Sequence, residues 1–208
     1  MEQLTYNKKI SDFRIHFQQF KSISSVLEFK FTYYDCYAIH DYYPKSRFGY
    51  DVDQEIQSVR SLVYAFKEGE PKAIDYVSKI ISTALKKLNI DLKDTCIAVI
   101  PSSEPEKTEK RFKLFCQNVS CILGINDGYG SIFGAKREPT KGSSQKDLLS
   151  HFTFFNKTYM GLNVLLFDDV YTTGSSFKQV ADRLIETGAQ NVIGIFLAKT
   201  IRACLNFA

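Results

Sequence analysis

The apolar positions of the chain alternate between the spacing of strands and the spacing of helices. Over residues 27–33 apolar and polar residues alternate, which predicts a half-buried strand. Residues 37–39 either continue this strand or pair back against it. From residue 53 onward the apolar spacing becomes that of helices, separated by short apolar runs typical of buried strands. We predict helices over 53–69, 71–88, 105–123 and 177–188, and strands over 95–100, 129–133, 164–167 and 192–198.

The predicted helices carry the end signals and apolar faces of helices that pack on a sheet. Asp53 can cap the first of them, and Gly69 with Pro71 ends it. The last one is stopped by Gly188. The helix over 105–123 is expected to direct four apolar residues inward, namely Phe112, Phe115, Val119 and Ile122.

Strands that alternate with helices are typical of a parallel α/β sheet. We therefore expect an α/β protein with a Rossmann-like parallel sheet in one compact domain. Residues 1–53 are rich in Tyr and Phe and less regular, so they form an accessory segment, and residues 54–208 form the core. Residues 137–145 contain Pro, Thr, Lys, Gly and Ser, which predicts a loop.

The composition is that of a globular protein, with 208 residues, 44% apolar and 24% charged. A net charge of +4 is too small to support nucleic acid as a partner. No apolar run is long enough to span a membrane, and residues 1–10 lack the apolar segment of a secretory signal. The five cysteines are odd in number and never in C-x-x-C spacing. This predicts reduced thiols, no zinc site and a cytoplasmic location.

The run 164–176 places polar chemistry after a predicted strand. Adjacent carboxylates are costly to bury unpaired, so their surroundings must be wet, cationic or filled with hydroxyl groups. Carboxylates can bind ribose hydroxyls, and backbone N–H groups at a helix N-terminus can bind a phosphate. The alternative is an acidic turn whose Ser or Thr caps the helix, although capping requires only one such residue. The residues concerned are Asp168 and Asp169, followed by Thr172, Thr173, Gly174, Ser175 and Ser176.

This run resembles the phosphoribosyl-pyrophosphate (PRPP) signature of type I phosphoribosyltransferases, in which an apolar strand, two acids and two apolar residues precede Thr-Thr-Gly-x-Ser/Thr. Tyr171 departs from the signature, because that position is usually aliphatic. The resemblance implies that Asp168 and Asp169 act at the catalytic centre, bind the ribose hydroxyls and hold Mg²⁺ directly or through water. It implies that Thr172–Ser176 hold the 5′-phosphate.

Two further segments are similar to the parts of that family that bind pyrophosphate. Ser102 and Ser103 stand where the family's pyrophosphate loop begins, and their alternative role is to cap the following helix. Lys136, Arg137 and Lys146 occupy the place of the family's flexible hood loop, whose cations cover the pyrophosphate. Their alternative role is solvated surface charge.

Within the family the chain is most similar to the branch of ComF-like competence proteins. The similarity covers residues 56–200 and is strongest over 161–200. The cysteine-rich zinc element of that branch is absent from the sequence, and its Arg-Gly-Phe-Asn-Gln segment is reduced to Arg111-Phe112 and Gln117. The residues that carry the similarity are Pro101, the loop residues Arg137, Gln145, Lys146 and Leu148, the run from Gly161 to Asp169, and Ala198-Lys199-Thr200.

The resemblance implies an enzyme that transfers ribose 5-phosphate from PRPP to a nitrogenous base, with Mg²⁺ on the leaving pyrophosphate. An aromatic-rich β hood built from residues 20–55 would choose the base. Relatives that act on hypoxanthine and guanine have an acid at the position of Thr172, and threonine cannot relay a proton as a carboxylate can. Four tyrosines could stack on a planar base or belong to the core: Tyr33, Tyr37, Tyr42 and Tyr43.

Two alternatives remain open at this point. The first is a PRPP- or nucleotide-sensing protein on the same fold that acts through a partner in DNA uptake or processing, because fold does not determine function. The second is direct binding of single-stranded DNA through the basic cluster at 107–113. The glutamates beside that cluster favour a solvated helix face instead. A homodimer is compatible with the main interpretation.

Overall fold

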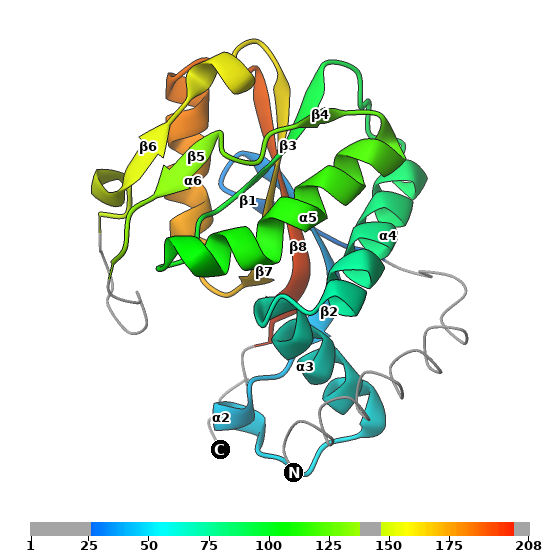
Figure 1. Ribbon diagram of the computed structural model, residues 1–208. Helices are drawn as coiled ribbons and strands as arrows, with labels where there is room; N and C mark the ends of the chain where they lie inside the picture. The colour runs from blue at the N-terminus through cyan, green and yellow to red at the C-terminus, as the bar shows by residue number, and fades with distance from the viewer. Residues whose placement is uncertain (1–25, 138–146, 202–208) are drawn as a thin grey trace.

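The computed structural model describes residues 26–137 and 147–201. Its centre is a six-stranded sheet in the order β1-β2-β8-β7-β3-β4 (Figure 1). β1 is antiparallel to β2, and every other neighbouring pair in this sheet is parallel. The expected α/β fold with a mainly parallel sheet is therefore confirmed. The strands are β1 (Leu27–Phe31), β2 (Tyr34–Tyr42), β3 (Thr95–Val99), β4 (Asn126–Asp127), β7 (Asn163–Tyr171) and β8 (Asn191–Thr200).

Other elements cover both faces of the sheet and bury its apolar side chains. On one face lie α3, α4 and α5, and on the other lies α6 together with a small antiparallel sheet of β5 and β6. Within the described residues no helix is long and apolar enough to cross a membrane. The bounds are α3 (Gln54–Lys67), α4 (Pro71–Lys87), α5 (Pro105–Leu123), α6 (Ser175–Glu186), β5 (Ile132–Gly134) and β6 (Phe152–Phe154), with the short helices α2 (Lys45–Phe48), η1 (Leu149–His151) and η2 (Asn156–Thr158).

The long helices begin and end close to where the sequence predicts. Asp53 caps α3, because its carboxylate accepts a hydrogen bond from the backbone N–H of Ile56 at 2.8 Å. Both α4 and α5 begin with a proline, which suits the first turn of a helix. The expectation that Ile122 faces inward is wrong. Ile122 is 38% exposed, and Leu123, one residue later, packs against the core in the last turn of α5.

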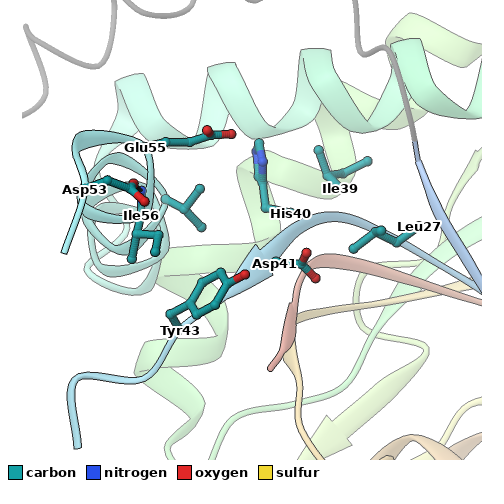
Figure 2. A pocket seen from close by; sticks show the side chains of 9 residues that line it. Leu27, Ile39, His40, Asp41, Tyr43, Asp53, Glu55 and Ile56 are labelled. Atoms are coloured by element: carbon teal, nitrogen blue, oxygen red, sulfur yellow. Dashed lines mark hydrogen bonds between the residues drawn. The ribbon is translucent and has the colours of Figure 1, made fainter. Parts of the chain in front are cut away.

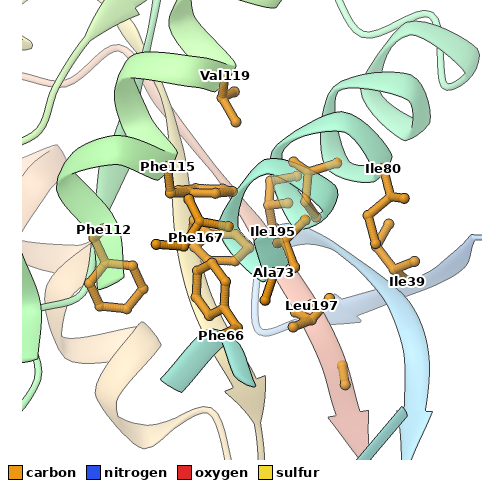
Figure 3. Packing of buried hydrophobic residues seen from close by; sticks show 14 of the residues in the cluster. Ile39, Phe66, Ala73, Ile80, Phe112, Phe115, Val119, Phe167, Ile195 and Leu197 are labelled. Atoms are coloured by element: carbon orange, nitrogen blue, oxygen red, sulfur yellow. The ribbon is translucent and has the colours of Figure 1, made fainter. Parts of the chain in front are cut away.

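Four phenylalanines pack together between α3, α5 and β7 (Figure 3). Phe115 stacks on Phe167 with ring centroids 4.1 Å apart, and Phe66 meets Phe167 edge to face at 5.8 Å. Phe112 also meets Phe167 edge to face, with ring centroids 6.2 Å apart. Two of these rings, Phe66 and Phe112, are immediate sequence neighbours of charged residues that meet Asp169 in the site described below. The aromatic core therefore fixes the backbone positions from which those charges extend.

The described part of the N-terminal segment joins the main sheet. The chain turns back through Thr32, which has a φ of 57°, and β2 then pairs with β1 and with β8. Of the two expectations for residues 37–39, pairing back is confirmed. Aromatic side chains gather here as expected, because Phe29 and Phe31 meet Tyr171 edge to face at 4.9 and 5.6 Å. The division of the chain near residue 53 stays a prediction.

β7 is longer than predicted, and this changes the setting of the two acids. The prediction that the strand ends at Phe167 is wrong, because pairing with β8 continues until Tyr171 faces Lys199. Asp168 lies opposite Phe196 in this ladder. A search for apolar runs stops at the first polar residue, whereas the backbone hydrogen bonds of a strand do not depend on side-chain polarity. The acids therefore extend from a paired strand and not from a turn.

Candidate functional site

The two acids of β7 point to opposite faces of the sheet, as neighbouring residues of a strand do. Asp169 reaches Lys67, the last residue of α3, and Arg111 on α5. Asp168 acts electrostatically on Arg137, which follows β5 on the other face. Both acids stand near the carboxyl end of the parallel strands, the edge at which open α/β sheets bind ligands. The two acids, which were predicted to act together, therefore lie in two different environments.

Asp169 is held by two cations. Lys67 Nζ lies 3.3 Å from its Oδ1, and Arg111 Nη1 lies 3.4 Å from its Oδ2. The side chains of Asp169 and Arg111 are only 10% and 14% exposed. Arg111 Nε also donates a hydrogen bond of 2.6 Å to the backbone carbonyl of Lys67. The cost of burying this carboxylate is offset by two opposite charges.

Asp168 has no such counter-charge in contact. Among the described residues, its carboxylate accepts one hydrogen bond of 2.8 Å, from the backbone N–H of Asp169, and forms no ion pair. Burial, and then the negative charge of Asp169, raise the pKa of Asp168 to about 7. An acid in this state suits a ligand that brings positive charge or hydroxyl groups to it.

The turn after β7 has a backbone geometry that suits an anion. Gly174 has a φ of +78°, and a Cβ there would lie 2.6 Å from Phe31 Cζ and 2.7 Å from the Tyr171 hydroxyl, so only glycine fits without displacement. Gly174 is the N-cap of α6 and has no side chain that could cap this helix. The first N–H groups of α6 thus remain available to a phosphate.

The hydroxyl groups of the same turn border this helix end. Thr172 and Thr200 share a hydrogen bond of 3.1 Å between their hydroxyls, which ties the turn to β8. The backbone N–H of Ser175 lies 3.4 Å from Thr173 Oγ1, at the outer limit of a hydrogen bond. Thr172, Thr173 and Ser175 are exposed and Ser176 is half-buried. The structure thus brings together the residues predicted to hold the 5′-phosphate.

The two segments predicted to bind pyrophosphate lie against each other. The Arg137 guanidinium donates hydrogen bonds to the carbonyls of Ser102 at 2.6 Å and Pro101 at 3.0 Å, and the backbone N–H of Arg137 donates to the carbonyl of Ser103 at 2.9 Å. The same guanidinium lies over the Phe152 ring, 4.8 Å from its centroid. Arg137 is therefore a half-buried brace of the loop after β3, not solvated surface charge.

The remaining predicted residues of these segments have different settings. The Ser102 hydroxyl donates to the carbonyl of Glu104 at 2.8 Å, and its backbone N–H donates to Thr108 Oγ1 at 2.9 Å. These bonds hold the loop in shape. The helix-cap alternative for the serines is not observed, because Glu104 is the N-cap residue of α5. Lys136 is exposed. Lys146 lies outside the described residues.

A hollow of about 290 Å³ lies between β2 and the start of α3 (Figure 2). Neither the acidic pair nor the turn after β7 contributes to its lining. Burial lowers the pKa of His40 to about 4, so its ring is neutral, and within the described residues its Nε2 has no hydrogen-bond partner. The lining consists of His40, Asp41, Tyr43, Asp53 and Glu55, with Leu27, Ile39, Ile56 and Val59 as its apolar part.

Of the four tyrosines expected to stack on a base or belong to the core, Tyr43 lines this hollow. Tyr37 and Tyr42 pack against the core of the α3–α5 face. The Tyr33 hydroxyl instead donates a hydrogen bond of 2.7 Å to Asp182 on α6. The tyrosines thus divide between the core, the surface of α6 and the hollow.

Sequence reasoning missed the roles of Lys67 and Arg111. It did require cations or water around two adjacent acids. It had no means to identify them, because Arg111 is 58 positions from Asp169 and meets it only through the packing of α5 on β7. The available signal was local: each cation is next to a phenylalanine of the helical apolar pattern, Phe66 and Phe112.

A divalent cation fits this site only in partnership with a ligand. The described residues contain no group of three or more His, Cys, Asp or Glu that could hold a metal ion. The acids of β7 offer carboxylate oxygens, the kind of donor that Mg²⁺ prefers. Mg²⁺ commonly binds one or two carboxylates together with substrate phosphates and water. The residues therefore fit an ion shared with a phosphorylated substrate.

The sequence matches no protein-family model, and no curated protein matches it in sequence. Solved structures that resemble the chain include UMP synthase of Leishmania donovani, with 16% identity, 68% of this chain and 24% of that chain covered, and a TM-score of 0.41. Another is adenine phosphoribosyltransferase of Thermoanaerobacter pseudethanolicus, with 15% identity, 70% and 86% covered, and a TM-score of 0.41. A third is a hypothetical protein of Neisseria gonorrhoeae with bound ppGpp, with 15% identity, 63% and 69% covered, and a TM-score of 0.40.

The matched part of the chain spans only about a quarter of the length of some of these proteins, including the UMP synthase and an allosteric regulatory enzyme of purine biosynthesis. The TM-scores are below 0.5 and the identities are low. The chemistry assigned to the site therefore rests on its own geometry.

Proposed function

We propose that the protein binds PRPP together with Mg²⁺ and transfers its ribose 5-phosphate to a nitrogenous base, releasing pyrophosphate. The observation that supports this most is the arrangement around the end of β7. An acid without a counter-charge, an acid held by two cations and an uncapped helix after a glycine turn lie along one short stretch of chain. Ribose hydroxyls, pyrophosphate and a 5′-phosphate are three groups that such parts can bind.

The proposed reaction exchanges one bond at C1 of the ribose. The lone pair of a base nitrogen forms the new N–C1 bond, and the C1–O bond to pyrophosphate breaks with its electron pair leaving on the pyrophosphate. The proton of the base passes to solvent or to the pyrophosphate. Positive charge develops on the ribose ring, and we assign the stabilisation of that charge to the acids of β7. When bound, Mg²⁺ would supply neutralisation of the leaving group.

The other predicted residues take binding roles in this proposal. We assign Thr172–Ser176 and the N–H groups of α6 to the 5′-phosphate. We assign the loop of Ser102 and Ser103, with Lys136 and Arg137, to the pyrophosphate side. Lys146 keeps the same predicted role. Closing this side against water would protect PRPP from hydrolysis.

We assign the acceptor base to the side of β2. Most of the lining of the hollow beside α3 comes from the segment 20–55 that was expected to choose the base, and it includes a planar Tyr43, a neutral His40 and carboxylates. Such a lining suits a planar ligand that donates N–H hydrogen bonds. Membership of the ComF-like branch, a cytoplasmic location and a homodimer remain narrower proposals.

Calorimetric titration with PRPP and Mg²⁺ tests the binding step. We expect Asp168→Asn combined with Asp169→Asn to abolish Mg²⁺-dependent binding, because both carboxylates are lost while the side-chain volumes are kept. Asp51→Asn, an exposed acid outside the site, is the control and should bind as wild type does. Unchanged binding in the double variant would contradict the assignment.

A panel of purine and pyrimidine bases tests the transfer step. Incubation with PRPP and Mg²⁺ should release pyrophosphate with at least one base and not with Asp168→Asn. Tight PRPP binding without release across the whole panel would support the sensing alternative and contradict the enzymatic one.

A further inference from the structure

We infer that the two acids of β7 have different roles: Asp168 alone faces the sugar, whereas Asp169 positions Lys67 and Arg111 as a site for a diphosphate group. This rests on the proposed function, in which both acids belong to one PRPP site, and it deepens that function by assigning the leaving pyrophosphate to a cation pair on α3 and α5. The two cations belong neither to the loop after β3 nor to the segment around Lys136 and Arg137.

The first evidence is the geometry of Arg111. Its shortest contact is the 2.6 Å hydrogen bond from Nε to the carbonyl of Lys67, while its Nη1 lies 3.4 Å from Asp169. The guanidinium is therefore fixed by backbone, and the carboxylate only orients its outer edge. A hydrogen bond to a charged group is normally shorter than 3 Å, so this ion pair is loose.

The turn after α3 explains how backbone and guanidinium come so close. Gly69 has a φ of +67°, and a Cβ there would lie 2.8 Å from the backbone carbonyl of Lys110 and 2.4 Å from its Cγ. No other residue fits this contact without displacing α5. The close approach of the turn to Lys110 brings the neighbouring Arg111 to the carbonyl of Lys67.

The second evidence is the balance of charge. Two cations contact one carboxylate in the corner formed by Lys67, Arg111 and Asp169, while Asp168 acts on both cations only electrostatically, without contact. Donors also remain: in the described residues Arg111 Nη2 makes no hydrogen bond, and Lys67, 35% exposed, has Asp169 as its contact. Planar guanidinium groups bind phosphate oxygens in a two-point manner, and ammonium groups bind them as point charges.

The third evidence is the position of this corner. Arg111 lies in the second turn of α5, the helix that begins directly after the loop of Ser102 and Ser103. Arg111 and Lys136 both act electrostatically on Glu104 at the start of that helix. The corner therefore adjoins the segment already assigned to pyrophosphate. Asp168, on the other face and without an ion pair, is left for hydroxyl groups or a cation.

Titration with inorganic pyrophosphate in the absence of Mg²⁺ isolates the anion site from the sugar and the metal. We expect Arg111→Gln and Lys67→Met each to weaken pyrophosphate binding about tenfold, the loss of one charged hydrogen bond. Asp169→Asn should strengthen it several-fold, because the competing carboxylate is removed. Asp168→Asn should change it by less than about twofold, since that acid faces the sugar.

Matched controls separate these effects from the general loss of positive charge. Arg183→Gln and Lys79→Met remove one exposed cation each outside the corner and should bind pyrophosphate as wild type does. Circular dichroism checks that each variant is folded, and Lys67→Met, at the half-buried end of α3, keeps the test available if Arg111→Gln is unstable. Arg111→Lys should restore part of the affinity, because it keeps the positive charge but loses the planar two-point donor geometry of the guanidinium.

The outcomes distinguish this inference from the proposed function. If wild type binds PRPP with Mg²⁺ but Arg111→Gln and Lys67→Met bind pyrophosphate normally, the inference is wrong and the function stands. If Asp169→Asn and Asp168→Asn weaken pyrophosphate binding equally, the division of roles is wrong. If pyrophosphate binding depends on Arg111 and Lys67 while PRPP with Mg²⁺ does not bind, the anion site stands and the proposed function fails.

Discussion

The two faces of β7 differ in how their charged residues are neutralised. On the α3–α5 face, Asp169 is held by Lys67 and Arg111, and a stack of phenylalanines fixes the strands and helices that carry them. On the α6 face, Asp168 has no ion pair among the described residues and α6 begins without a side-chain cap. The first face is completed by the protein's own contacts. The second leaves polar groups without protein partners, an arrangement that costs stability and that a ligand could complete.

The largest effect should follow from breaking the packed face. Phe167→Ala removes the ring on which Phe115 stacks and which Phe66 and Phe112 touch, so we expect a loss of about 3–5 kcal/mol in the free energy of unfolding. Denaturant titration measures it. The control Phe133→Ala removes a ring that is 54% exposed and should cost less than about 1 kcal/mol. If Phe167→Ala and Phe133→Ala lowered the free energy of unfolding equally, the phenylalanine stack would not be what stabilises this face of the sheet.

A smaller effect, of opposite sign on the two faces, should follow from neutralising each acid. Asp169→Asn leaves two cations facing each other and should lower the free energy of unfolding by about 1–3 kcal/mol at pH 8. Asp168→Asn should raise it by about 1–3 kcal/mol at pH 8, because the native fold disfavours the charged form of Asp168.

The stability gained in Asp168→Asn should depend on pH. The pKa of Asp168 is about 7 in the native state against 3.8 for a free carboxyl, so the native state keeps a proton that the unfolded chain has lost. Wild-type stability therefore falls as the pH rises between these two values. The gain in Asp168→Asn should accordingly grow from pH 5 to pH 7 and then level off. A gain independent of pH, or a loss, would contradict the assignment of Asp168 as the uncompensated acid.

The smallest effect should follow from filling the turn on the ligand face. Gly174→Ala adds a Cβ at positive φ and close to Phe31 and Tyr171, so we expect about 1–2 kcal/mol of lost stability together with weaker PRPP binding. The control is Gly124→Ala, at the end of α5, where φ is +67° and no atom lies within 4 Å of the added Cβ. The difference between the two variants isolates the contact. If they lose the same stability, the aromatic wall does not constrain the turn.

The periodicity of apolar residues was sufficient to predict the long helices and the central strands of the parallel sheet, but the strand predicted over 129–133 begins only at Ile132 and belongs to the small antiparallel sheet. Helix ends were predictable because Asp53 and the prolines that begin α4 and α5 act locally. The bounds of β7 were not, because pairing with β8 carries the strand past the first polar residue to Tyr171. The inward position of Ile122 failed for a related reason, since the last turn of α5 presents Leu123 to the core instead.

The candidate site, too, was only partly predictable from the sequence. The run from Asp168 to Ser176 could be identified from the sequence, because carboxylates, hydroxyls, glycine and the start of a helix are contiguous there and their arrangement is set by local geometry. The different environments of the two acids, the bracing of Arg137 against the loop after β3, and the cations Lys67 and Arg111 were not readable. These depend on which face of a strand each side chain takes and on helices far apart in the chain that pack against that face. Charge pairing between distant residues follows from packing, and packing is a property of the folded molecule.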